Sequence, residues 1–568
     1  MTRLQRLSVA MRAGPPAMLR KAMRAGSGGG QGSEEVVKDK IIQLLKRVAP
    51  EEKIVVEIPK EESLGDYSTN LAFVLAGQKK KPPLGIAQEI VKKLPETDFL
   101  EKIEVAPPGF INFYLKDEWL AERVGEILEQ GEQFGSSKIG KGKKVLIEFI
   151  SANPTGPLTV GNGRGGFFGD VLANVLEKAG YKTKREYYVN DRGGQIETLG
   201  ASIIRAKIKD KKTKMQIQDQ KLYQGEYIKK LAQKIKGGSL QTVGQRAAKI
   251  ILSDIKKTVK KAEIEFNSWV LESSLIKNSL VEKVITQLKK RGLVYEKDGA
   301  VWFSSSKFGD DKDRVLKKQS GEFTYFAADA AYHLDKASRS DIMIDIWGAD
   351  HHGDVSRILA IARVFGFEDK LKIILHQFAH IIQKGERARM SKRRGLYVTL
   401  DELIDEAGLD AVRFFFLTKS IDSHLDFDIE KAKEKSEQNP VYYIQYAYAR
   451  CSSILRKFKT TISKSKTNPK SKIPNYKLLV HPAEISLIKH LIKFPDLVKE
   501  TASDYQVQRL PFYAYDLANS FHNFYEKCKV LDEKNPDLTS ARCSLIQATQ
   551  VVLKNTLNLL GIKSPERM

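Results

Sequence analysis

The chain has 568 residues, and its 95 Lys and Arg residues outnumber its 70 Asp and Glu residues, which gives a net charge of +25. This length exceeds what one hydrophobic core supports, so we expect two to four domains, and the positive charge favours either a polyanionic partner or a lysine-rich surface. No apolar run approaches the roughly 20 residues needed to span a bilayer, and the three cysteines form no C-x-x-C pair, which excludes a disulfide framework or a zinc motif.

Residues 1–33 differ in composition from the rest of the chain. They carry six Arg or Lys residues and no acidic residue, and they end in a Gly/Ser-rich run that predicts disorder. An Arg-rich, acid-poor segment is typical of an organellar transit peptide, but a start site assigned upstream of Met11, Met18 or Met23 explains it equally well. We therefore expect a disordered basic extension, and a cytoplasmic protein unless this extension directs import into an organelle.

Residues 34–118 predict a small α+β domain. A helical pattern occupies residues 34–48, a strand follows at residues 54–58, and a second helix covers residues 84–93. Residues 103–115 read as two short strands around a Pro-Pro-Gly turn. None of these features indicates a function.

A strand, a loop and a helix follow one another between Lys143 and Gly180. Val145 to Ile150 is an apolar β-forming run, and residues 163–179 have apolar residues at helical spacing. The intervening loop is rich in Pro, Gly, Ser and Asn. Because a helix N-terminus offers free N–H groups and a positive dipole end, this unit predicts a site for an anionic group.

Residues 161–166 match the dinucleotide-binding pattern G-x-G-x-x-G. In that motif the first glycine follows the strand closely, whereas ten residues separate Ile150 from Gly161, and Pro154 and Pro157 impose an extended path. Asp191, after a second predicted strand at residues 183–189, is nominally available to bind a ribose. The dinucleotide interpretation is therefore disfavoured but not excluded.

Alternating strands and helices between residues 140 and 430 predict a largely parallel sheet, with a lysine-rich helical insertion near residues 203–262 and a further strand at residues 300–305. Residues 321–336 and 342–361 read as strand ends that lead into helices. Since ligands bind at the carboxyl ends of parallel strands, their acidic residues are candidates, although helix N-terminal acids are the simpler explanation. Adjacent histidines point in different directions, so a metal site is disfavoured at His351 and His352.

Residues 384–394 contain six basic side chains, with glycines at positions 385 and 395. A solvated charge run is the usual explanation, but a glycine-flanked mobile loop could also place cations over a polyphosphate. Beyond it, residues 431–568 read as helices almost to the C-terminus and predict an all-α bundle.

The pattern S-x-N-P-T-G-P-L-x-V-G-x-G-R at residues 151–164 resembles the HIGH region of class I aminoacyl-tRNA synthetases, and in particular of arginyl-tRNA synthetases. Residues 389–392, Arg-Met-Ser-Lys, resemble the KMSK loop of the same class. Residues 65–73 and 107–115 are similar to that family's N-terminal additional domain, and residues 515–531 to its anticodon-binding domain. The chain departs from the family at two positions, where Thr159 and Asn162 replace the usual histidines.

This resemblance covers residues 34–568 and implies a Rossmann-like parallel-sheet catalytic domain at residues 140–430. It also implies that the small N-terminal domain touches the elbow of the tRNA and that the C-terminal helical bundle binds the anticodon. It implies an arginine–tRNA ligase that converts arginine and ATP to arginyl-adenylate and then esterifies the 3′-terminal adenosine of tRNA(Arg), releasing AMP and pyrophosphate. The alternative is a catalytically weak or silent paralogue that binds tRNA. The expected partners are tRNA(Arg), arginine, ATP and Mg²⁺, with no membrane, and the expected state is a monomer.

Three groups of site residues follow from the resemblance. The catalytic residues are expected to be Thr159, Asn162 and Lys392. ATP is expected to contact both loops, through Pro157, Thr159, Gly161, Asn162, Gly163, Met390, Ser391 and Lys392. Arginine is expected to be held by Glu148, Ser151, Asn153, Asn162, Tyr325, Asp329 and Asp350. No residue is assigned as a metal ligand.

Overall fold

The computed structural model describes residues 36–59, 61–208, 222–383, 385–387, 398–464 and 474–568. The predicted extension at residues 1–33 lies outside these ranges. So do Met390, Ser391 and Lys392, the three predicted site residues of the second loop.

The N-terminal part is an antiparallel sheet of four strands in the order β1-β2-β4-β3, with helices packed against it. The two strands predicted around the Pro-Pro-Gly turn are β3 and β4, and the predicted first helix is α3. The bounds are α3 Val37–Lys46, β1 Val56–Glu57, β2 Tyr67–Thr69, α4 Leu71–Lys79, α5 Pro83–Val91, β3 Leu100–Ala106, β4 Phe110–Leu115 and, leading out of this part, α6 Asp117–Gln130. Tyr67 of the inner strand β2 is fully buried, and its hydroxyl donates to Asp496, in the C-terminal helices, at 3.4 Å.

The central part is built on a five-stranded sheet in the order β12-β11-β5-β6-β7, and all of its pairings are parallel. The strands are β5 Lys144–Glu148, β6 Lys182–Val189, β7 Ser268–Leu271, β11 Ile342–Gly348 and β12 Leu371–His376. The chain leaves β5 towards β6 on one side, and β11 lies on the other side. A ligand crevice is expected outside the carboxyl ends of β5 and β11, because the strand order reverses there.

Helix α7, Val160–Lys178, connects β5 to β6 and lies unusually close to the sheet. A Cβ atom at Gly169 would be 2.4 Å from the Phe149 ring, and one at Gly166 would be 2.9 Å from Ile150. The helix starts three residues earlier than predicted, so Gly161 and Gly163 belong to its first turn. The glycines of this stretch therefore allow the helix to pack closely on the sheet.

The helical insertion predicted near residues 203–262 consists of α8 Gly194–Lys207, α9 Glu226–Lys234 and α10 Leu240–Lys261 in the described ranges. Helices α8 and α10 cross in direct backbone contact. A Cβ atom at Gly200 would lie 1.9 Å from the carbonyl oxygen of Leu240, and one at Gly244 would lie 2.0 Å from that of Ile196.

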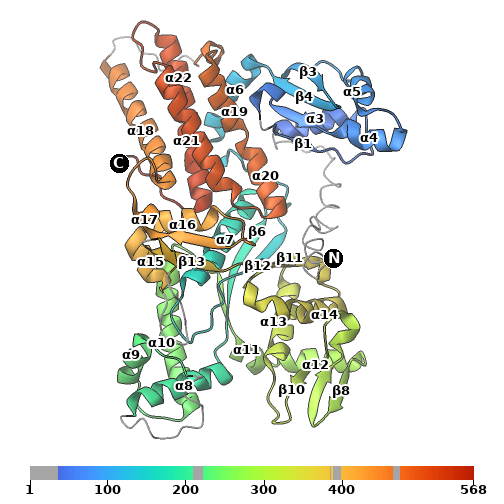
Figure 1. The fold of residues 1–568 in the computed structure, drawn as a ribbon, viewed down its shortest axis with the longest axis vertical. Helices are drawn as coiled ribbons and strands as arrows, with labels where there is room; N and C mark the ends of the chain where they lie inside the picture. The colour runs from blue at the N-terminus through green and yellow to red at the C-terminus, as the bar shows by residue number, and fades with distance from the viewer. Residues whose placement is uncertain (1–35, 60, 209–221, 384, 388–397, 465–473) are drawn as a thin grey trace.

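A second lobe follows β7 in the sequence (Figure 1). It contains α11 Glu272–Lys277, α12 Leu280–Lys290, β8 Val294–Lys297, β9 Ala300–Phe303, β10 Arg314–Lys317, α13 Tyr325–Arg339, the 3-10 segment η5 Ala349–Asp354 and α14 Val355–Phe365. The strand predicted at residues 300–305 is β9, but it belongs to an antiparallel sheet of its own.

One strand-end prediction is wrong. Residues 321–336 do not end a strand: α13 begins at Tyr325, and Thr324 caps it by accepting a hydrogen bond from the Ala327 N–H at 3.3 Å. The alanine-rich run after Tyr325 favours a helix. Asp329 therefore lies in the second turn of this helix, whereas Asp350 does follow a strand, β11, as predicted.

The C-terminal part is helical, as predicted. Before it, the chain forms a small sheet in the order β14-β13-β15 with three short helices; these are β13 Ala379–Gln383, β14 Glu386–Arg387, α15 Leu400–Ala407, α16 Leu409–Leu417, β15 Leu425–Asp428 and α17 Ile429–Lys433. The long helices are α18 Pro440–Lys464, α19 Pro482–Ile492, α20 Phe494–Asp504, α21 Arg509–Lys527 and α22 Pro536–Leu560. Among the described helices, none is both long and apolar enough to cross a membrane.

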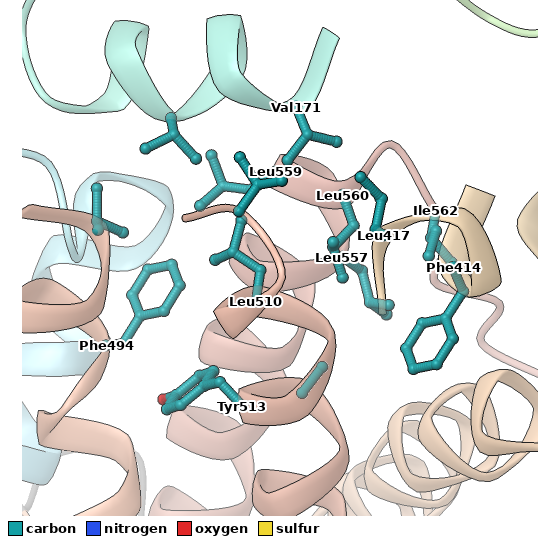
Figure 2. Close-up of a cluster of buried hydrophobic side chains, with 14 of the residues drawn as sticks. Val171, Phe414, Leu417, Phe494, Leu510, Tyr513, Leu557, Leu559, Leu560 and Ile562 are labelled. Atoms are coloured by element: carbon teal, nitrogen blue, oxygen red, sulfur yellow. The ribbon is translucent and has the colours of Figure 1, made fainter. Parts of the chain in front are cut away.

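A buried apolar cluster joins this bundle to the central part (Figure 2). Val171 of α7 lies beside the C-terminal end of α22, where Leu557, Leu559 and Leu560 are buried, and Phe414 of α16 packs nearby. The helix that begins at the predicted ATP loop is therefore part of the same core as the C-terminal helices.

Candidate active site

The carboxyl end of β5 turns sharply into the predicted binding loop. Ile150 and Ser151 both have left-handed backbones, with φ of 66° and 37°, and a β-branched residue rarely adopts this conformation. Two hydrogen bonds hold the turn: the Ser151 hydroxyl donates to Glu148 Oε1 at 2.9 Å and accepts from the Tyr188 N–H at 3.0 Å. The position of Ser151 is thus fixed by the ends of β5 and β6.

The remainder of the loop is held by the second strand and the insertion. The Asn153 side-chain amide donates to Gln195 of α8 at 2.7 Å. The Tyr187 hydroxyl donates to the Ala152 carbonyl at 2.9 Å, and the Tyr227 hydroxyl donates to the Thr155 carbonyl at 3.0 Å. Ser151 and Asn153, two of the predicted arginine ligands, are therefore both held by hydrogen bonds in the loop after β5.

Thr159 and Asn162 form the N-terminal cap of α7. The Asn162 Oδ1 atom accepts from the Thr159 N–H at 2.9 Å and from the Thr159 hydroxyl at 3.0 Å. Both contacts use the amide oxygen, which leaves the Asn162 N–H groups as donors for an anion at the helix N-terminus. Pro157 precedes this cap, and Thr159 also pairs with Thr399, the second described residue after the gap at 388–397.

A cluster of acidic and hydroxyl groups lies on α11 and α13, next to the carboxyl end of β7. Tyr325 is 40% exposed, and its hydroxyl lies 3.5 Å from the Arg192 carbonyl oxygen. Burial raises the pKa of Asp329 to about 6, although the nearby charges of His333 and Arg357 lower it. Glu272, the first residue of α11, is only 3% exposed, and its Oε2 atom has no hydrogen-bond partner among the described residues.

Of the Asp329 and Glu272 carboxyls, Glu272 has the more strongly raised pKa. Its burial and, next, the negative charge of Asp329 raise this pKa to about 8, although the charge of Arg192 lowers it. Two other buried oxygens, the Tyr188 hydroxyl and the Asn190 amide oxygen, also lack partners among the described residues. Acceptors that are buried and unpaired are costly unless a ligand donates to them. A planar cation with several N–H groups matches this set.

Three family descriptions match the chain. They are "Arginyl tRNA synthetase N terminal domain" at residues 34–115, "tRNA synthetases class I (R), catalytic domain" at residues 123–416 and "DALR anticodon binding domain" at residues 444–568. The "Arginine--tRNA ligase" of Carboxydothermus hydrogenoformans is 42% identical over 526 residues, which is 90% of this chain and 94% of that protein. The chain belongs to the arginyl-tRNA synthetase family.

Further comparisons agree with this assignment. The "Arginine--tRNA ligase" of Geobacillus thermodenitrificans is also 42% identical and covers 94% of this chain and 99% of its own. The solved Thermus thermophilus arginyl-tRNA synthetase, at 24% identity, matches the fold with a TM-score of 0.74 over 93% of this chain and 98% of its own. The predicted class I architecture is confirmed.

Membership of the arginyl-tRNA synthetase family contradicts the dinucleotide interpretation, and the geometry explains why. Strand β5 ends at Glu148, well before Gly161, and the G-x-G-x-x-G residues lie inside α7. The Asp191 carboxylate, which a ribose would need, accepts from the Ser273 N–H and hydroxyl at 2.9 Å and 2.6 Å. Asp191 therefore holds the first turn of α11.

Two predicted arginine ligands of this arginyl-tRNA synthetase are placed differently from the others. Glu148 is only 4% exposed, and besides Ser151 it is bonded to Lys336, at 2.8 Å. The Asp350 side chain is 66% exposed, and no hydrogen bond or ion pair within the described residues joins it to Tyr325 or Asp329. Glu148 is therefore buried at the end of β5, while Asp350 is exposed in the turn that follows β11.

Sequence reasoning did not identify Glu272. The signal was present, because this acidic residue directly follows the short strand β7 in the parallel sheet, and the same rule had identified Asp350. The strand is only four residues long, so its carboxyl end was not recognisable from periodicity.

Proposed function

We propose that the crevice between β5 and β11 activates arginine in an arginine–tRNA ligase. The single observation that supports this proposal is the cluster of Tyr325, Asp329 and Glu272 near the Ser151–Asn162 loop. The Glu272 carboxyl is buried, and its Oε2 atom has no hydrogen-bond partner among the described residues. Ionised carboxylates in a fixed array pair with a guanidinium through several parallel hydrogen bonds.

The reaction has two steps. In the first, an oxygen of the arginine carboxylate attacks the α-phosphorus of ATP, and the bond to pyrophosphate breaks. In the second, a hydroxyl of the 3′-terminal adenosine of tRNA(Arg) attacks the activated carbonyl, and AMP leaves. Such transfers need little covalent participation from the protein, so positioning and charge stabilisation dominate.

In our proposal the loop residues hold the reacting groups. Ser151 and Asn153 orient the arginine backbone, and Thr159 and Asn162, with Pro157, Gly161 and Gly163 beside them, form the cap region that receives the phosphates. Met390, Ser391 and Lys392 belong to this site on sequence grounds alone, with Lys392 meeting charge on the leaving pyrophosphate. Asp350, which is exposed in the turn after β11, would make an outer contact with arginine.

Magnesium fits this site as a companion of ATP. Mg²⁺ is usually held by substrate phosphates, waters and one or two carboxylates, and the described residues contain no group of three or more metal-ligating side chains. When bound, the ion would offset negative charge on the phosphates.

We propose the same division of labour for the other parts of the chain as the family implies. Residues 34–118 would contact the elbow of tRNA(Arg), residues 140–430 would carry the catalysis, and residues 431–568 would bind the anticodon. The family matches at residues 34–115 and 444–568 support this division. We further propose a monomer located in the cytoplasm, unless residues 1–33 direct import.

Purified protein mixed with tRNA(Arg), ATP and arginine tests the function. The expected product is arginyl-tRNA, with AMP and pyrophosphate formed in equal amounts. Binding of tRNA without any arginyl-tRNA would instead support the silent paralogue. Light scattering checks the monomer, and sequencing of the native N-terminus decides whether residues 1–33 are present.

A further inference from the structure

Lys336 is a fully buried lysine directly beneath the proposed active site. Its Nζ atom lies 2.8 Å from Glu148 Oε2 and 2.7 Å from Asp345 Oδ1. The lysine and Asp345 side chains are 0% exposed, and that of Glu148 is 6% exposed. A lysine is almost never buried in this way unless its charge is paired.

The two carboxylates come from the two strands that flank the crevice. Glu148 and Asp345 are register partners in β5 and β11, the strands between which the strand order reverses. Burial alone would lower the pKa of Lys336, but the charges of Asp345 and Glu148 raise it above its ordinary value. Lys336 is therefore a cation that bridges the two strand ends.

The helix that carries Lys336 also carries the proposed arginine pocket. Tyr325, Asp329, His333 and Lys336 follow one another at intervals of four, four and three residues, so they share one face of α13. His333 Nε2 lies 2.8 Å from Asp345 Oδ2, and its Nδ1 lies 2.7 Å from the Asp329 carbonyl oxygen. The two deeper residues thus tie this face of α13 to the sheet.

The other oxygen of Glu148 supports the substrate loop. Glu148 Oε1 accepts from the hydroxyl of Ser151, whose backbone is left-handed. Lys336, Glu148 and Ser151 therefore form a continuous path from α13 to the loop. Glu148 is already paired with a cation inside the protein.

We propose that Lys336 is a positioning residue for arginine: it neutralises Glu148 and uses it to fix Ser151 relative to Tyr325 and Asp329. Glu148 then acts through its hydrogen bond to Ser151, and its charge is not used to bind the substrate. This inference rests on the proposed function and deepens it. It differs from the expectation that Glu148 itself binds the arginine side chain.

The discriminating test compares Lys336→Met with a double variant that combines Glu148→Gln and Lys336→Met, in arginine-dependent ATP–pyrophosphate exchange with tRNA present. Lys336→Met leaves the buried carboxylates of both Glu148 and Asp345 without their lysine, so we expect the KM for arginine to rise about tenfold or more. Its KM for ATP should stay within about twofold, because the ATP loop keeps its own cap.

The double variant removes both charges, and the amide oxygen introduced by Glu148→Gln can still accept the Ser151 hydrogen bond. Asp345 still lacks its lysine in this variant and keeps its contact with His333, so we expect the thermal midpoint to recover only in part. We expect the KM for arginine to return to within about threefold of the wild-type value. If Glu148 binds arginine through its charge, the double variant will remain as impaired as Lys336→Met, which would overturn the inference. The double variant also covers the case in which Lys336→Met fails to fold.

Lys370→Met is a matched control, because Lys370 contacts the C-terminal end of the same helix through the carbonyls of Ala337 and Ser340. It should change neither KM. An unchanged KM for arginine in Lys336→Met would overturn this inference alone. A wild-type protein without any arginine-dependent exchange would overturn the proposed function as well.

Discussion

Arg413 of α16 forms a buried ion pair with Asp170 of α7, and the Arg413 side chain is 0% exposed. The same guanidinium donates to the carbonyl oxygens of Ala262, at 2.8 Å, and Leu560, at 3.1 Å. It therefore joins the helix behind the ATP loop to the ends of α10 and α22. One side chain connects the central sheet, the insertion and the C-terminal bundle.

Replacing Arg413 with leucine should destabilise the protein strongly. The change leaves the Asp170 carboxylate and two carbonyl groups without this donor in a buried setting, and breaking a buried pair typically costs about 3–5 kcal/mol. Chemical denaturation measures this loss as a lower free energy of unfolding. Lys229→Leu, which breaks the exposed pair with Glu226, should cost less than about 1 kcal/mol. Equal losses for the two variants would contradict this account.

Neutral replacements in the arginine pocket should weaken arginine binding selectively. Asp329→Asn and Glu272→Gln each remove an anionic partner of the guanidinium, so we expect the KM for arginine to rise by about 30-fold or more, equivalent to about 2 kcal/mol. The KM for ATP should be unaffected. Tyr325→Phe removes only one neutral hydroxyl and should raise the KM for arginine by about tenfold or less. A comparable rise in both KM values would indicate a general loss of structure.

Arginine binding should release a proton near neutral pH. The pKa of Glu272 is raised to about 8 in the free protein, so its carboxyl is largely protonated at pH 7, and the guanidinium needs the ionised form. The KM for arginine should therefore fall at least about tenfold between pH 6 and pH 8. Calorimetry in buffers of different ionisation enthalpy measures the released proton directly. Glu272→Gln should abolish the dependence on the buffer.

The same raised pKa has the opposite effect on the stability of the free protein. The folded state holds this proton more tightly than the unfolded state, in which the carboxyl has its ordinary pKa of 4.5. Stability is therefore lost as the pH rises from about 4.5 towards 8, and arginine should restore it. The thermal midpoint, measured at pH 6 and pH 8 with and without arginine, checks this prediction. It should be lower at pH 8 in the free protein, and arginine should raise it there.

Asn162→Asp separates capping from phosphate binding. Aspartate keeps an oxygen acceptor for the Thr159 N–H and hydroxyl, so the start of α7 should lose no stability. It lacks the amide N–H donors and adds a negative charge beside the phosphates, so the KM for ATP should rise about tenfold or more. Asn162→Ala should instead lower stability by about 1 kcal/mol. Normal ATP kinetics in Asn162→Asp would show that Asn162 is only a cap.

Gly169→Ala tests the close approach of α7 to the sheet. The new Cβ atom would lie 2.4 Å from the Phe149 ring, and overpacking of this kind costs about 1–3 kcal/mol. Gly77→Ala, in α4, is a matched control because nothing lies within 4 Å of the new Cβ. That control substitution should raise the free energy of unfolding by up to about 1 kcal/mol, because alanine favours a helix more than glycine does. The two free energies of unfolding should thus change in opposite directions.

A family motif was sufficient to propose four of the site residues. Ser151, Asn153, Thr159 and Asn162 lie within twelve residues of one another, so a single strand–loop–helix unit carries them. Helical spacing predicted the C-terminal bundle, and an apolar run followed by a polar turn predicted β11. These elements could be predicted because the periodicity of buried side chains is a property of one segment.

Only the tertiary structure decided how distant segments of the chain are arranged relative to one another. The order of the five strands and the position of Glu272 beside Asp329 depend on contacts between residues tens to hundreds of positions apart. The bond between Lys336 and Glu148 joins residues 188 positions apart. No local pattern encodes such a contact, because a buried lysine is tolerated only where the fold brings carboxylates to it.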